Sequence, residues 1–237
     1  MIRHLALTLL ALTLATTAAR AQSEPEYRME IGGGLTMLTY EGDFNGSPLG
    51  KMQPAATLML RRLFNVYSGL RLDATYGKIK GSSEDVDTYY DAYATEPYTF
   101  DRTLVDVSLT YEYNFWPYGT GQEYRGARRL TPYVFGGLGF TYAGGGEGDG
   151  EETKSVCTAN LPLGLGLKYK VSSRLNVGLQ WAMHFSLSDR LDGVADPYGI
   201  KSSGLFKNTD CYSRLTLSLT YSFMPKCRTC HNDRENQ

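Results

Sequence analysis

The sequence lacks any internal apolar run approaching the roughly 18 residues that a membrane-spanning helix needs. It has only four cysteines and three histidines, and no zinc-ligand spacing, phosphate-binding glycine loop or basic nucleic-acid patch. Its 24 basic and 25 acidic residues nearly cancel. These absences exclude a helical membrane protein. They also predict no metal, no cofactor, no nucleic-acid partner and no small-molecule substrate.

A strict alternation of side chains is the strongest pattern in the chain. Along Asn160–Phe185, apolar residues alternate with polar residues and glycines in two arms, which Val171–Arg174 separates. Strand side chains point to opposite faces with a period of two, so each arm has one apolar face. Arms of about ten residues fit a hairpin that crosses a bilayer obliquely. The pattern predicts a transmembrane β-barrel.

The same alternation predicts eight strands: Tyr27–Tyr40, Met52–Arg62, Asn65–Gly77, Phe100–Phe115, Thr131–Tyr142, Asn160–Lys170, Leu175–Phe185 and Tyr212–Phe223. Short connections alternate with long ones, although Trp116–Leu130 is long for a turn. We therefore predict an all-β fold, an eight-stranded antiparallel transmembrane β-barrel with short periplasmic turns and longer extracellular loops. The main alternative is a soluble lipocalin-like barrel, whose apolar face would point inward.

The N-terminus resembles a signal peptide. Arg3 and His4 precede the apolar stretch Leu5–Ala18, and Ala19–Ala21 fits a small-residue cleavage site. We predict a signal peptide over residues 1–21, an outer-membrane barrel domain over 22–223 and a periplasmic tail over 224–237.

The inward positions are rich in charge. An eight-stranded barrel has room inside only for its own side chains, and buried charges need partners. The predicted interior is therefore ion-paired and closed, and it contains Arg28, Glu30, Arg71, Asp73, Arg102, Asp106, Glu112, Lys168 and Arg214. Pro162 predicts a bulge or an edge within its strand, because proline cannot donate a ladder hydrogen bond.

Two motifs carry possible chemistry. His184 and Ser186 share one face and resemble the His/Ser pair of lipid A deacylases, but parity turns both inward, so we expect a core histidine and no enzymatic activity. Cys227-x-x-Cys230-His231 has the spacing of covalent haem attachment, but it follows the last strand in a polar tail, so we expect no haem. Of the possible disulfides, Cys157–Cys211 with Cys227–Cys230 suits the predicted topology.

The predicted ends of the barrel differ in charge. The four long loops sum to −8, whereas the periplasmic segments carry a net positive charge. The long turn adds aromatic residues to this basic end, and arginine with aromatics is the mixture enriched at interface centres. We predict a site for a periplasmic partner at Trp116, Tyr118, Tyr124, Arg125, Arg128 and Arg129.

Several phrases resemble one family. They are EIGGGLTMLTYEGDF at Glu30–Phe44, TPYVFGGLGF at Thr131–Phe140, LGLGLKYKVSSRLNVGLQWAMHFSLSDRLDGV at Leu163–Val194, LTLSLTYSF at Leu215–Phe223 and the Cys227–His231 tail. Together they are similar to PorG-type outer-membrane barrels, which are associated with the type IX secretion system of Bacteroidota. The resemblance implies a non-catalytic component that contacts outer-membrane lipid and periplasmic secretion-ring proteins of the PorK/PorN kind. A stand-alone structural or adhesive barrel and a lipid A-modifying enzyme are the alternatives.

Overall fold

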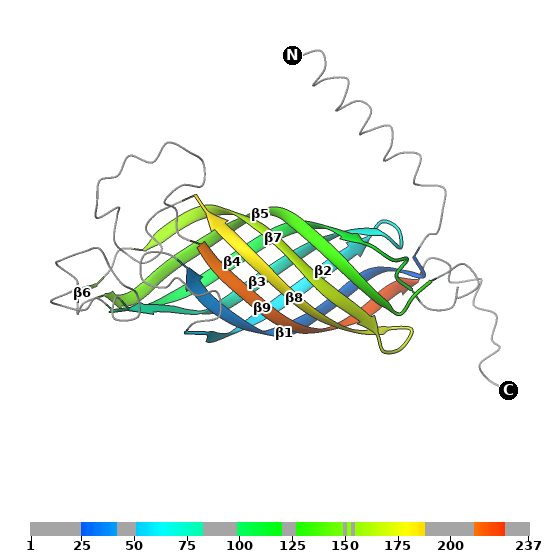
Figure 1. The fold of residues 1–237 in the computed structure, drawn as a ribbon, viewed down its shortest axis with the longest axis horizontal. Coiled ribbons are helices and arrows are strands. Elements are labelled where there is room, and N and C mark those ends of the chain that lie inside the picture. Colours follow the sequence, from blue (N-terminus) through cyan, green and yellow to red (C-terminus); the bar gives the residue numbers. More distant parts are fainter. Residues whose placement is uncertain are drawn as a thin grey trace, which may run out of the picture.

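The computed structural model describes residues 25–41, 51–82, 99–119, 127–148, 151–152, 155–187 and 211–225 (Figure 1). It has nine strands: β1 Tyr27–Glu41, β2 Gln53–Leu63, β3 Ser68–Ser82, β4 Thr99–Asn114, β5 Leu130–Gly148, β6 Glu151–Glu152, β7 Val156–Lys170, β8 Leu175–Ser186 and β9 Cys211–Pro225. No helix within these ranges is long and apolar enough to cross a membrane.

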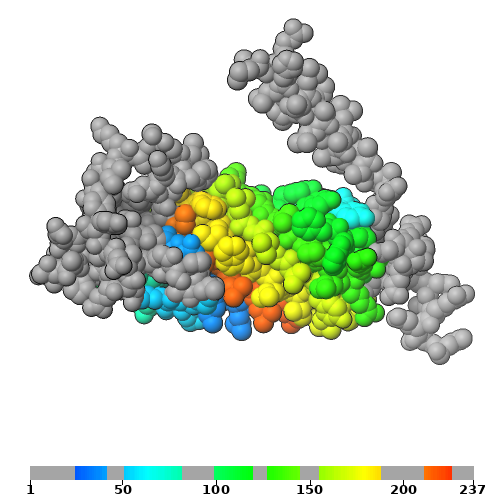
Figure 2. Space-filling view, in the orientation of Figure 1, coloured from blue at the N-terminus to red at the C-terminus, as the bar shows by residue number. Residues whose placement is uncertain are grey.

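The strands close into a barrel. Each long strand pairs antiparallel with its neighbours in the order β4-β3-β2-β1-β9-β8-β7-β5, and β5 pairs again with β4. The two-residue β6 pairs with β5 alone and adds no strand to the wall. Figure 2 shows the closure from outside, with the first and last strands, blue and orange, next to each other on one surface. The predicted eight-stranded antiparallel barrel is confirmed.

The outer surface is apolar. Leu35, Leu58, Leu138 and Phe140 are between 66% and 77% exposed, and leucines and aromatics cover the other outward positions. An exposed apolar surface of this extent, around a closed wall of paired strands, is typical of a barrel in lipid. The lipocalin-like alternative is wrong, because its apolar residues would line the inside.

Strand ends differ from the prediction in several places. β3 begins at Ser68 rather than Asn65, and Val66 is buried in the preceding turn instead of facing outward. β3 and β5 run on to Ser82 and Gly148, into predicted loops, and β9 ends at Pro225. Pro162 causes no bulge: the β7–β8 register is unbroken and pairs Pro162 with His184. The face assignments in β7 therefore hold.

At one end of the barrel the polarity of the two faces is reversed, with apolar side chains inside and charged ones outside. We call this the long-loop end, because the β1–β2, β3–β4, β5–β7 and β8–β9 connections lie there. Leu38, Tyr40, Ile79 and Phe100 belong to a buried apolar cluster inside the barrel. On the outside, Lys80 Nζ lies 3.0 Å from an Asp101 carboxylate oxygen, and Lys78 lies 3.5 Å from it. Apolar side chains inside with charges outside indicate that the wall here is in water, so these strands extend beyond the lipid.

Glycines on the inner wall make room for aromatic rings. A Cβ added at Gly164 would lie 2.4 Å from the ring of Phe135, and one at Gly166 would lie 2.8 Å from that of Tyr133. Both rings point inward from β5 and stack at a centroid distance of 5.7 Å. The glycines of β7 therefore allow a narrow barrel to hold large side chains.

We expect the two ends to label differently in intact cells. In a cysteine-free background, Lys78→Cys and Thr99→Cys at the long-loop end should react with an impermeant maleimide. Ser173→Cys, in the turn at the opposite end, should react only after lysis, because the bilayer protects that end. Equal labelling of all three in intact cells would refute the orientation.

Candidate functional site

One carboxylate inside the barrel pairs with three buried cations. Glu112 on β4 accepts from Arg71 Nη1 at 2.6 Å and pairs with Arg61 Nε at 2.8 Å and with Lys168 Nζ. Arg61 also pairs with Glu30. All five side chains are at most 4% exposed, so the charges are nearly removed from water. Such charges remain ionised only when they are paired and hydrogen-bonded, as they are here.

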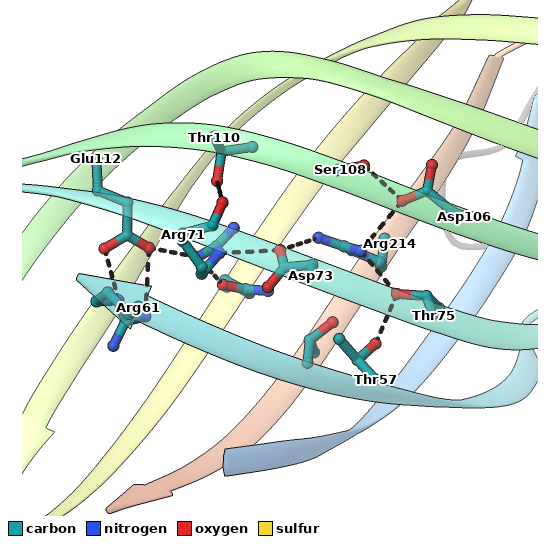
Figure 3. A network of polar contacts seen from close by, with 12 residues as sticks. Thr57, Arg61, Arg71, Asp73, Thr75, Asp106, Ser108, Thr110, Glu112 and Arg214 are labelled. Atoms are coloured by element: carbon teal, nitrogen blue, oxygen red, sulfur yellow. Dashed lines mark hydrogen bonds and ion pairs between the residues drawn. The ribbon is translucent and has the colours of Figure 1, made fainter. Parts of the chain in front are cut away.

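The network continues along the barrel axis (Figure 3). Asp73 Oδ2 accepts from Arg71 Nε and from Arg214 Nη2, both at 2.9 Å. Arg214 Nη1 donates to Thr75 at 2.8 Å and lies 3.7 Å from Asp106. Arginine suits this bridging role, because its planar guanidinium presents donors in several directions. Strands far apart in sequence are thereby joined through the interior.

His184 belongs to this network. Its ring stacks on Tyr212 with the centroids 4.5 Å apart, and its Nδ1 lies 3.0 Å from the Tyr212 hydroxyl. Tyr212 in turn donates to Asp106 at 2.8 Å. His184 and Ser186 are both 0% exposed and point inward, as predicted. Neither can touch a lipid on the outer surface, so the geometry is that of a core histidine.

The other end of the barrel carries the 64–67, 115–129 and 171–174 turns and is here called the short-turn end. Tyr118, from the long turn, points into the barrel, is 3% exposed and donates to Asn176 Oδ1 at 3.0 Å. Burial raises the pKa of Tyr118 well above its ordinary value, so the hydroxyl keeps its proton. Lys170 Nζ lies 5.3 Å from the ring of Tyr118 and 5.8 Å from that of Tyr27. The ring of Tyr118 therefore fills the mouth of the barrel.

The ion-paired interior is confirmed, with three changes of membership. Arg28 was predicted inside but is exposed, near the first residue of β1. Arg61 and Lys170 were counted with the basic rim but are 4% and 3% exposed. Among the described residues, the buried bases are Arg61, Arg71, Arg102, Lys168, Lys170 and Arg214, and the buried carboxylates are Glu30, Asp73, Asp106 and Glu112.

The long turn is braced across the short-turn end. Tyr118 N–H donates to the carbonyl of Val66 at 3.1 Å, which joins the turn to the β2–β3 connection. Within the turn, Arg128 N–H donates to Pro117 and Gly119 N–H donates to Arg128. Lys170 N–H donates to the carbonyl of Arg129 at 2.8 Å. The base of the turn is therefore fixed to β2–β3 on one side and to β7 on the other.

This bracing places part of the predicted partner site on the surface. Trp116 is 39% exposed, and the Arg128 guanidinium lies 4.9 Å from the centre of its ring. Arg129 is exposed beside it. Tyr118 does not belong to this surface, because it fills the mouth of the barrel. Tyr124 and Arg125 lie outside the described residues.

One further arrangement had no clear signal in the sequence. Arg174, in the 171–174 turn, donates through Nη1 to the hydroxyl of Tyr221 at 3.0 Å and through Nε to that of Tyr27 at 3.3 Å. Alternation predicted Tyr221 outward, and it is 45% exposed. Only the register of β1 against β9 brings the two tyrosines near one arginine.

The predicted disulfide between Cys157 and Cys211 is not formed. Cys211 lies opposite Phe185 on β8, whereas Cys157 lies opposite Tyr142 on β5. β8 therefore separates the two cysteines, and two strand spacings of about 4.8 Å exceed the reach of a disulfide. Cys227 and Cys230 lie outside the described residues. Within the described ranges, no group of histidine, cysteine and carboxylate side chains could hold a metal ion.

We expect Glu112→Ala to lower the free energy of unfolding by about 3–5 kcal/mol, because three buried cations lose their shared partner. Lys80→Ala should cost less than about 1 kcal/mol, because its ion pair with Asp101 is exposed. Urea unfolding of the two variants in vesicles measures both. Similar losses would show that the buried network does not hold the barrel together.

Comparison with solved structures returns small outer-membrane barrels. OprG from Pseudomonas aeruginosa is 11% identical over 85% of this chain and 98% of its own, with a TM-score of 0.49. Neisserial surface protein A is 14% identical over 85% and 100%, with a TM-score of 0.47. Ail of Yersinia pestis, solved with the heparin analogue sucrose octasulfate, is 14% identical over 84% and 99%, with a TM-score of 0.46.

Sequence comparison identifies the family. No curated protein matches the chain significantly. A family model described as Domain of unknown function (DUF6089) matches residues 7–232, which include the whole barrel wall and the braced turn. The chain therefore belongs to the DUF6089 family.

Proposed function

We propose that this protein is a non-enzymatic component of the type IX protein secretion machinery. In this proposal it lies in the outer membrane and links that membrane to a periplasmic ring complex of the PorK/PorN kind. The proposal combines the resemblance to PorG-type barrels with one structural observation. That observation is the braced turn at the short-turn end, which presents Trp116, Arg128 and Arg129 outside the barrel.

The composition of this surface supports a protein partner. Arginine and tryptophan are the residues most enriched at the energetic centres of interfaces. The guanidinium of Arg128 lies over the ring of Trp116, and this contact restricts both side chains before a partner binds. Binding would therefore cost less side-chain entropy. We infer that the partner presents a polar or acidic surface.

The filled interior supports an attachment role over transport. Glu112, Asp73 and Asp106 hold their cations along the axis, and Tyr118 and the apolar cluster lie at the two ends. A solute would have to break several buried ion pairs in order to pass, each at a cost of a few kcal/mol. A barrel with a filled interior would act through the surfaces at its two ends.

A stand-alone structural or adhesive barrel is the second candidate. The extension of β3, β4 and β5 beyond the apolar belt favours it, because this part of the wall projects into water at the long-loop end. Such a protein would act through that end and would need no partner at the short-turn end. The two candidates therefore differ in which end a mutation disables.

We expect Arg128→Glu with Arg129→Glu to reduce co-purification of periplasmic ring proteins at least tenfold and to lower cargo secretion. Reversed charges would oppose both steering and pairing. The matched control is Lys78→Glu with Lys80→Glu at the long-loop end, which changes charge equally. Normal secretion by the first variant, or equal loss in both, would contradict the proposed docking surface.

We expect His184→Ala to leave lipid A unchanged, because the side chain is sealed from lipid. The substitution should instead lower the stability of the barrel, because Tyr212 and Asp106 lose a partner. Mass spectrometry of lipid A and a thermal unfolding curve measure the two effects. A missing acyl modification in this variant would support the enzyme alternative instead.

A further inference from the structure

Arg174 is held in place by its own turn. The N–H groups of Val171 and Ser172 donate to the carbonyl of Leu175, and Ser172 Oγ accepts from the N–H groups of Arg174 and Leu175. The carbonyl of Arg174 accepts from Ser222 on β9 at 2.6 Å. The backbone from which this side chain extends is therefore fixed to the barrel wall.

The guanidinium is oriented by tyrosines from two further strands. Tyr27 on β1 and Tyr221 on β9 each accept one hydrogen bond, and the guanidinium carbon lies 5.7 Å from the centre of the Tyr27 ring. A guanidinium has five N–H donors, so donors remain for a ligand. Arg174 is exposed, and none of the described carboxylates pairs with it. Within the described part of the chain it is therefore a fixed cation that no carboxylate neutralises.

Its location decides which anion suits it. Tyr221 follows Leu217 and Leu219 on the outward face of β9, all between 45% and 55% exposed. Arg174 therefore lies where the apolar belt ends, on the side of the barrel and not on its axis. Tyrosine and arginine at such a boundary lie at the level of lipid head groups.

Other arginines follow the same rim. Arg62 points outward on β2, two residues beyond the exposed Leu60, and Arg28 is exposed at the start of β1. With Arg128, Arg129 and Arg174, the exposed cations described at this end are all arginines. Arginine binds phosphate oxygens in a bidentate manner, which lysine cannot do.

We propose that the short-turn rim binds the phosphate groups of phospholipids in the adjacent leaflet, with Arg174, Tyr27 and Tyr221 as the principal site. The guanidinium donates to two phosphate oxygens while the acyl chains lie against Leu217 and Leu219. The principal site is separate from the turn surface of Trp116 and Arg128, because its side chains come from the 171–174 turn and from β1 and β9. It would remain if the proposed secretion role were wrong.

Native mass spectrometry of the purified barrel in detergent tests the proposal. The probe is dioleoyl phosphatidylglycerol, compared with a galactolipid of the same acyl chains that has no phosphate. Wild-type protein should retain the phospholipid and not the galactolipid. Arg174→Gln should weaken retention about fivefold, the effect of losing one exposed charge-assisted contact. Arg174→Lys should recover part of it.

Three comparisons make the test decisive. Tyr27→Phe with Tyr221→Phe keeps the charge but removes the orienting hydroxyls, and should weaken retention about twofold. Lys80→Gln, at the other end, should change nothing. Heat-dependent gel migration shows that each variant is folded. Equal retention by Arg174→Gln and wild type, equal retention of the galactolipid, or release by millimolar inorganic phosphate would overturn the proposal.

Discussion

The pairing of β1 with β9 is the constraint on which the rest of the molecule depends. From Tyr27–Pro225 to Glu41–Cys211, it joins the two ends of the barrel domain and leaves the wall without an edge. In lipid, an edge would expose unpaired backbone groups at several kcal/mol each. Closure with eight strands also fixes a narrow bore. Inward charges must then meet one another, which explains why Glu112 has three cationic neighbours.

Period-two alternation made most of the wall predictable. It identified every long strand, the outward leucines of β7 and the inward His184, because parity alone decides the face. Parity does not show how far along the barrel axis a residue lies. Arg61 and Lys170 look like rim residues in sequence, and their burial follows from the stagger of neighbouring strands. The extra length of β3 was also hidden, because Lys78 and Lys80 look like loop residues until Ile79 is seen to be buried between them.

The functional surfaces were less predictable than the wall. The composition of the long turn indicated a contact site, but Tyr118 and Trp116 have similar character in sequence and point in opposite directions. Hydrogen bonds from distant segments decide which faces inward, and no local pattern encodes them. The Arg174 cluster is a stronger example. Its three side chains come from β1, from β9 and from the turn between β7 and β8. The disulfide prediction failed for the same reason, because shared location at one rim does not make two cysteines neighbours.

The braced turn has a consequence for the order of assembly. Its supports come from the β2–β3 connection and the end of β7, so the arrangement of Trp116 and Arg128 exists only after both have reached their final positions. Tyr118 enters the mouth only when Asn176 on β8 is there to receive it. The surface thus reports that maturation is complete. A partner that recognised it would bind finished barrels and not intermediates still being inserted.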